Sequence, residues 1–147
     1  MSVINIVKNI KQIHPEYIAL IKIGKFYYSY GKDAYIISYN FNYKIKKVEE
    51  NVCVCAFPVS TTNKIISKLE ENKINYLLID RRNNYYVDEK SDNKNLNKYD
   101  IFFENAKKYI NLKNRIDNIY DYLISNMENE KELIKQIENL INERRKI

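Results

Sequence analysis

Aromatic and basic residues crowd into one short stretch of the chain, GKFYYSYGKDA (Gly24–Ala34), which also holds both of its glycines. Four aromatic rings fall within five residues, and lysines lie on either side of them. Rings at this density can fill a protein core, or they can stack on a flat partner such as a nucleobase. The lysines favour the second use, because nucleic-acid binding needs cations that neutralise phosphates.

The distribution of charge supports a polyanionic partner. The formal net charge is +6, and residues 1–50 carry eight Lys or Arg against four Asp or Glu. The excess therefore lies around the aromatic stretch, and a basic patch of this kind most often binds nucleic acid. AT-rich coding sequence also enriches lysine, so the charge supports this interpretation without deciding it.

Residues suited to catalysis or metal binding are sparse. The single histidine, His14, directly precedes Pro15, and no nucleophile with a partner base is evident. Cys53 and Cys55 are two residues apart, too close in sequence for an ordinary disulfide. We expect them to be buried free thiols on a core strand. The sequence therefore predicts a non-enzymatic protein without catalytic residues, metal or cofactor.

The N-terminal segment breaks its apolar residues with Asn, Lys and Gln, unlike a secretory signal. No run of 18 or more apolar residues occurs, so we expect no membrane span. These two patterns predict a cytoplasmic protein.

The aromatic stretch must be positioned by a sheet. Apolar residues at helical spacing predict an amphipathic helix over residues 3–13. Residues 17–30 are rich in Ile, Tyr and Phe and predict one long strand. Strict alternation along that strand would place Lys22, Phe26 and Tyr28 on one face and Tyr27 on the other.

Helices and strands then alternate along the chain. The patterns predict a helix starting near Lys32 or Asp33, a short basic strand or loop around residues 43–50, and a strand over 51–58 that Pro58 ends. Next come a helix over residues 60–73, a strand over 74–82, a returning strand at 85–89 and a polar loop over 90–98. This order predicts an α+β fold with α/β-like alternation, in which helices flank a mixed sheet formed by residues 1–98.

Residues 99–147 form a second region, and their pattern predicts a helical or coiled-coil tail. Its apolar residues lie three and four positions apart, at Leu112, Ile116, Ile119 and Leu123. One long helix is possible, but we favour a helical hairpin that turns near residues 125–129, with Ser125 and Glu128 at capping-box spacing. Such a tail can fold back onto the sheet, form a homo-oligomer, or bind a helical protein partner through residues 105–147.

Two blocks of the sequence resemble domain I, the mismatch-recognition domain, of MutS-type DNA mismatch repair proteins. In the first block, His14–Ser38, the matching residues are His14, Pro15, Glu16, Lys22, Gly24, Phe26, Tyr27, Asp33 and Ala34. In the second, Cys53–Asp80, the matches are Pro58, Lys68 and Leu69. The blocks occur in the family's order, and the resemblance covers roughly residues 3–90.

The resemblance implies that Phe26 is a wedge, a ring inserted into the base stack beside a mismatch. In the family a glutamate two residues later bonds the displaced base, but here Tyr28 occupies that position and cannot act as a carboxylate. Lys25 replaces an expected aspartate, and Ala56 and Phe57 occupy the turn where a glycine normally precedes Pro58. The expected DNA contacts are Phe26, Tyr28, Lys22, Lys25, Lys44, Lys46 and Lys64.

The family's ATPase motif is missing, since the sequence contains no G-x-x-x-x-G-K followed by Ser or Thr. Two hypotheses follow. The first is a stand-alone module that binds kinked or mispaired duplex DNA through an aromatic wedge and lysines. The alternative is a non-catalytic interaction or regulatory protein that has lost DNA reading and binds a partner through its helical tail.

Overall fold

The structure is a computed structural model that describes residues 2–48, 51–91 and 98–146. The chain divides into two compact units, which we call unit 1 (residues 1–110) and unit 2 (residues 111–147). Unit 1 contains the sheet, and unit 2 is helical.

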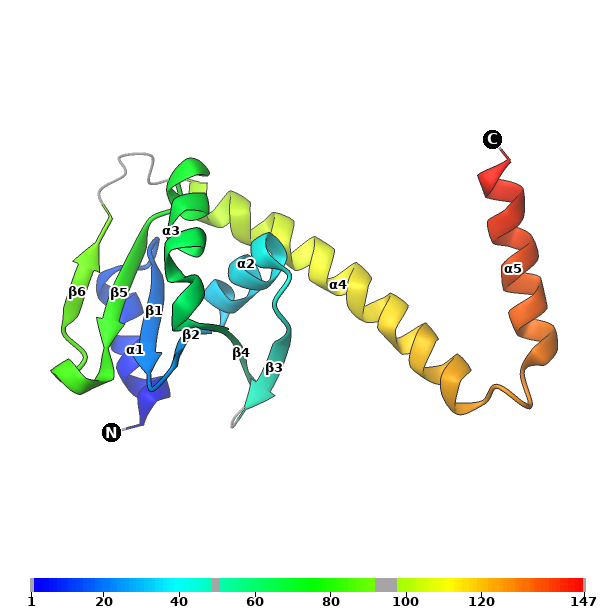
Figure 1. The fold of residues 1–147 in the computed structure, drawn as a ribbon, viewed down its shortest axis with the longest axis horizontal. Helices are drawn as coiled ribbons and strands as arrows, with labels where there is room; N and C mark the ends of the chain where they lie inside the picture. Colours follow the sequence, from blue (N-terminus) through cyan, green and yellow to red (C-terminus); the bar gives the residue numbers. More distant parts are fainter. Residues whose placement is uncertain (1, 49–50, 92–97, 147) are drawn as a thin grey trace. The chain divides into compact units, whose positions relative to one another are not determined.

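A six-stranded sheet forms the centre of unit 1, with the strand order β3-β4-β2-β1-β5-β6 (Figure 1). β1 and β5 are parallel, and every other neighbouring pair is antiparallel, so the sheet is mixed and the fold is α+β, as the sequence predicts. The strands are β1 (Ile18–Ile23), β2 (Phe26–Tyr30), β3 (Ile45–Val48), β4 (Val52–Pro58), β5 (Tyr76–Asp80) and β6 (Val87–Lys90). Residues 92–97 of the expected polar loop lie outside the described residues.

Helices cover both faces of the sheet (Figure 1). The helices are α1 (Val3–Ile13), α2 (Lys32–Phe41), α3 (Thr62–Glu71), α4 (Lys98–Ser125) and α5 (Lys131–Arg145), with short 3-10 helices η2 (Val59–Thr61) and η3 (Arg81–Asn83). On one face, Val7 of α1 packs against a small cluster of Ala19, Ile21, Leu77 and Ile79. On the other, α2, α3 and the first turns of α4 bury the larger part of the core.

The long strand expected over residues 17–30 is wrong. The chain forms a hairpin instead, in which Gly24 and Lys25 connect β1 to β2 and Ile23 pairs with Phe26. Gly24 adopts φ +64° and Lys25 has no positive φ, which is the pattern of a type II′ turn with glycine in its first central position. Strand-forming residues continue on both sides of this turn, so the single glycine is its main sequence signal.

The hairpin also changes which side chains share a face. Residues directly opposite each other in an antiparallel pair point to the same side of the sheet, and here Lys22 pairs with Tyr27. Lys22 therefore lies on the face of Tyr27, and its expected place beside Phe26 and Tyr28 on one face is wrong. Tyr27 itself is buried and stacks on Phe57 at 5.6 Å between ring centroids, so its predicted role in the core is confirmed.

Both cysteines lie on β4 with their side chains toward the larger core cluster. They are free thiols, and Cys55 is fully buried whereas Cys53 is half-buried. Burial raises the pKa of Cys55 to about 12, so this thiol stays protonated at neutral pH.

A buried polar network ties α1, α2 and α4 together. The Lys11 ammonium lies 2.9 Å from Oδ1 of Asp33, the backbone N–H of Ala19 donates to Oδ2 at 3.0 Å, and the Tyr99 hydroxyl donates to Oδ1. Asp33 is completely buried. Burial raises the pKa of its carboxyl above the ordinary value, although the contacts from Lys11, Tyr99 and Ala19 oppose this shift.

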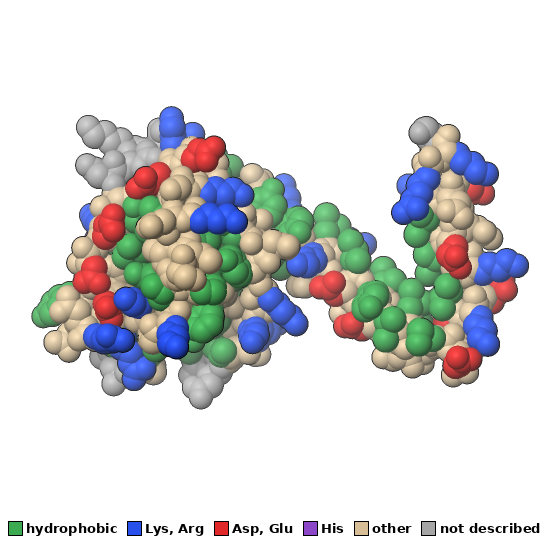
Figure 2. Space-filling view, viewed as in Figure 1, with side chains coloured by type: hydrophobic (Ala, Val, Ile, Leu, Met, Phe, Trp, Pro, Cys, Tyr) green, Lys and Arg blue, Asp and Glu red, His purple; other side chains and the backbone are tan. Residues whose placement is uncertain are grey.

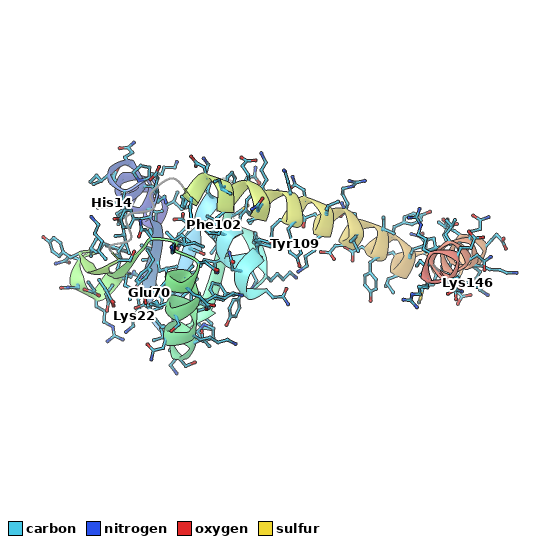
Figure 3. The ribbon with its side chains drawn as sticks, turned by 90° about the horizontal axis from the view of Figure 1, so that it is seen from above. His14, Lys22, Glu70, Phe102, Tyr109 and Lys146 are labelled. Carbon is cyan, nitrogen blue, oxygen red and sulfur yellow. The ribbon has the colours of Figure 1, made fainter. Side chains whose placement is uncertain are left out.

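The C-terminal region consists of two helices, as favoured from the sequence, because α4 ends at Ser125 and α5 begins at Lys131. The expected capping box is wrong: Ser125 is the last residue of α4, and Glu130 precedes α5 without a side-chain cap. The first turns of α4 belong to unit 1, where Tyr99, Ala106 and Ile110 are buried and Phe102 packs against the core (Figure 3). Within the described ranges, every helix is too short or too polar to cross a membrane.

Candidate nucleic-acid interface

The tip of the β1–β2 hairpin presents an exposed aromatic ring. Phe26 is the first residue of β2, directly after the turn, and 43% of its surface is exposed. Its neighbour Tyr27 points into the core, so alternation along the strand leaves Phe26 on the opposite side. Single exposed apolar side chains are common on protein surfaces, so the exposure of Phe26 establishes only that its ring is accessible to a flat partner.

The tip is anchored to the end of β4. Phe26 lies opposite Pro58, and the carbonyl oxygen of Lys25 accepts a hydrogen bond from the backbone N–H of Val59 at 2.9 Å. The Thr61 hydroxyl donates to the carbonyl oxygen of Pro58 at 2.8 Å, which fixes η2 beneath the tip. An anchored tip holds the Phe26 ring at a defined place, as an inserting side chain requires.

Cations line a hollow beside this ring. A shallow hollow of about 470 Å³ opens beside the tip, and its lining residues are Lys22, Gly24, Lys25, Phe26, Pro58, Val59, Ser60 and Arg82. Three of these are cationic and none is acidic. Figure 2 shows Lys and Arg side chains gathered along the end of unit 1 at which β1 and β5 finish in Figure 1. The surroundings of Phe26 therefore suit a polyanion.

Tyr28 extends the aromatic surface along β2. Its ring centroid lies 6.4 Å from that of Phe26, with 56° between the ring planes, and its side chain is half-buried. Tyr30, one step further, packs against the cluster beneath α1. Burial, assisted by the nearby hydroxyls of Tyr28 and Tyr85, raises the pKa of Tyr30 to about 12. Phe26 and Tyr28 are thus the accessible rings of this face, and Tyr30 is more enclosed.

The other expected lysines lie further out. Lys46 projects from β3, and the register through Val54 to Tyr30 puts it on the same face as Phe26 and Tyr28. Lys44, just before β3, and Lys64, in the first turn of α3, are exposed but do not line the hollow. Lys22 and Lys25 thus line the same hollow as Phe26, Lys22 from the opposite face of the sheet, and Lys44, Lys46 and Lys64 are outlying cations.

Arg82 is the residue of this site that sequence reasoning missed. It lies in η3, directly after β5, at the end of the strand that the sequence predicts over residues 74–82. β5 runs parallel to β1, with Lys22 opposite Asp80, so the residues after β5 reach the hairpin tip. Two adjacent arginines, Arg81 and Arg82, were the sequence signal for further cations at this site. Their position near the hairpin tip could not be predicted, because the sequence does not show that β1 and β5 are neighbouring strands.

Catalytic groups do not converge at this tip. His14 lies in another part of unit 1, edge-on to Tyr17 at 5.5 Å between ring centroids. Burial, followed by the positive charges of Lys90 and Lys11, lowers the pKa of its imidazole. No three potential metal ligands come together within residues 2–48, 51–91 and 98–146.

An exposed ring on an anchored hairpin, with cations beside it and a mixed sheet to support it, is a candidate nucleic-acid interface of a small α+β module. The family model for MutS domain I matches residues 2–87, which is more than half of the chain. The chain therefore belongs to the MutS domain I family, and the resemblance of the two sequence blocks is confirmed. Membership points to DNA binding of the mismatch-recognition type by a non-catalytic domain. No curated protein matches the sequence.

Proposed function

We propose that unit 1 binds duplex DNA at kinked or mispaired sites by inserting Phe26 into the base stack. The observation that carries this proposal is the exposure of Phe26 at the anchored tip, beside Lys22, Lys25 and Arg82. Family membership supports the same activity. The protein acts in the cytoplasm, without ATP hydrolysis or any other catalytic step.

Insertion selects weakened base pairs for an energetic reason. A ring stacked on a base contributes about 1–3 kcal/mol, whereas opening the stack costs a few kcal/mol. The cost is smallest where pairing is already damaged. A wedge therefore binds a mispaired step more tightly than a paired one, even without reading the identity of a base.

Lysines hold the duplex against the tip in this proposal. Lys22, Lys25 and Arg82 contact the phosphates beside the inserted ring, and Lys44, Lys46 and Lys64 contact phosphates further along. Each neutralised phosphate releases counterions, so affinity falls as salt rises, with a slope of about −0.9 per contact on logarithmic axes.

The test is a titration of the protein against a matched duplex and the same duplex with one mismatch, at about 50 and 200 mM salt. Fluorescence anisotropy of labelled DNA reports binding. We expect the wild type to prefer the mismatched duplex, and Phe26→Ala to lower affinity for it by roughly 5- to 100-fold. Tyr86→Ala is the matched control, because Tyr86 is a 68% exposed aromatic residue outside the hollow.

Lysine variants test the phosphate contacts in the same assay. Lys25→Gln should reduce the salt slope by about 0.9, and Lys73→Gln, at the other end of α3 from the tip, should leave it unchanged. No binding to either duplex at low salt would rule the proposal out. Equal binding to both, insensitive to Phe26→Ala, would leave only a nonspecific basic protein.

A second candidate function is that of an interaction protein that binds a partner through the helical tail. The specific observation is the apolar surface of unit 2, where Ile116 is 64% exposed and Leu140 is 59% exposed. Affinity capture with the full chain should then recover a partner that a chain lacking residues 111–147 does not. Recovery of the same partners by both chains would count against it.

A further inference from the structure

Unit 2 has no core of its own. None of its described residues, 111–146, is buried, and most of its apolar side chains are exposed. The part of α4 in this unit and α5 are each about 15 residues long, a length at which isolated helices are marginal in water. A unit of this size usually needs a covalent staple or association to be stable. The two helices therefore require another surface.

The apolar faces of both helices are wide. At about 100° per residue, the apolar positions span roughly 140° of α4 and 120° of α5. They are Leu112, Ile116, Ile119, Tyr120, Leu123 and Ile124 on α4, and Leu133, Ile134, Ile137, Leu140 and Ile141 on α5. A two-stranded coiled coil uses a narrower stripe, whereas faces this wide are typical of helices in a bundle.

The two helices complement each other when aligned antiparallel. The central apolar positions mirror one another about Glu128, so that Leu123 meets Leu133, Ile119 meets Ile137 and Ile116 meets Leu140. Three matched apolar layers make the surface of α5 complementary to that of α4.

A single chain does not bury the apolar faces of both α4 and α5. Hydrogen bonds set the turn between the helices, with the Tyr122 hydroxyl donating to Oε2 of Glu130 at 2.6 Å and Nδ2 of Asn126 donating to the carbonyl oxygen of Tyr122 at 2.8 Å. The apolar positions stay exposed beside this turn, as Ile119 at 57% and Tyr120 at 61% show (Figure 2). Closing a single hairpin would cover the central stripe but leave flanking residues such as Tyr120 and Ile141 in water.

We propose that the surface covering unit 2 is a second copy of this chain. Two tails form an antiparallel four-helix bundle, in which each α4 packs against α5 of both chains. The bundle buries the full width of all four apolar faces. The resulting dimer carries two copies of unit 1, which raises the effective concentration of the second hairpin tip once the first has bound.

Sedimentation equilibrium of the full chain over about 1–200 μM tests this proposal, a range that covers micromolar dissociation constants. We expect a species of twice the chain mass of 17.7 kDa. Ile119→Asp would bury an unpaired carboxylate in the bundle and should weaken association at least roughly 100-fold. Asn118→Asp adds the same charge on the opposite side of α4 and should have no effect on the dimer.

A mass of 17.7 kDa at every concentration of the full chain would overturn the proposal, whatever effect Ile119→Asp has on the helicity of that monomer. A dimer that Ile119→Asp leaves intact would overturn it as well.

Discussion

Tyr28 is the single residue that most affects what this site can distinguish. It lies 6.4 Å from Phe26 on the same strand face, in the position where the family's base-bonding glutamate is expected. A tyrosine offers a ring and a hydroxyl but no carboxylate. In the proposed function, the site therefore offers DNA two aromatic surfaces and cations, and its selectivity comes from the ease of insertion.

Tyr28→Glu tests this account. A carboxylate beside the wedge can accept a charged hydrogen bond from a displaced base, which is worth about 1.5–3 kcal/mol, while its charge repels neighbouring phosphates. We expect weaker binding to a matched duplex and a ratio of mismatched to matched affinity at least roughly fivefold higher. Parallel titrations of wild type, Tyr28→Glu and Tyr28→Gln measure this ratio, and no change from wild type in the Glu variant would contradict the account.

Gly24 sets the conformation of the tip. Its φ of +64° is one that side chains with a Cβ rarely adopt, although an added Cβ would meet no atom within 4 Å. Gly24→Ala should therefore lower the free energy of unfolding through backbone strain alone, by about 1–2 kcal/mol. Chemical denaturation measures the change, with Ser60→Ala as a control in the same hollow. A loss below about 0.3 kcal/mol would show that the turn adapts to a side chain.

Residue types could be predicted from the sequence more readily than residue neighbours. The exposure of Phe26 and the burial of Tyr27 follow from pattern and resemblance, because alternation separates adjacent side chains. The face of Lys22 could not be predicted without the turn at Gly24, since a two-residue reversal changes which residues lie opposite one another. The place of Arg82 depends on the parallel pairing of β1 and β5, for which no local pattern exists.

At the scale of elements, the network around Asp33 fixes α2 to α1 and α4. Lys11, Ala19 and Tyr99 come from three different elements and all bond the same carboxylate. Asp33 lies in the first turn of α2, which follows directly after β2. The bonds to its carboxylate therefore also help to position the β1–β2 hairpin. The Asp-Ala pair in the family resemblance thus has a structural explanation here.

Removal of this carboxylate should be costly. Asp33→Ala leaves the largely buried Lys11 ammonium without its partner, and we expect the free energy of unfolding to fall by about 3–5 kcal/mol. Lys11→Met added to Asp33→Ala should recover part of the loss, because no unpaired charge then remains. Urea denaturation of the three proteins measures both effects. If Asp33→Ala lowers the free energy of unfolding by less than about 1 kcal/mol, solvent must stabilise the Lys11 ammonium in place of the carboxylate.

At the scale of the whole molecule, the alternation of helices and strands predicted the α+β class and the mixed sheet, because periodicity reports elements directly. The division of the chain is harder to predict, since α4 is one continuous helix that takes part in both units. Its first turns are buried on the sheet and its last turns are exposed, yet both carry apolar residues at helical spacing.

Two truncations distinguish these parts of α4. A chain ending at Ile110 keeps Tyr99, Ala106 and Ile110 in place, and we expect its Tm to stay within about 4 °C of the full chain. A chain ending at Asn97 loses these buried side chains, worth about 1.5–3 kcal/mol each for the larger ones, and its Tm should fall by more than about 10 °C. Thermal unfolding followed by circular dichroism compares the two. Equal Tm values would place the boundary of the folded unit before α4.

The strand order gives the lysines of β3 a consequence unrelated to DNA. β3 lies at the border of the sheet, with β4 on one side only, so its outer backbone groups have no strand partner within the described sheet. An exposed edge strand can pair with a strand from another molecule, and such pairing leads to aggregation. Exposed lysines on the edge strand oppose this pairing through charge repulsion and solvation. Lys46 and Lys47 are both exposed there, so their charges keep one sheet from joining the next.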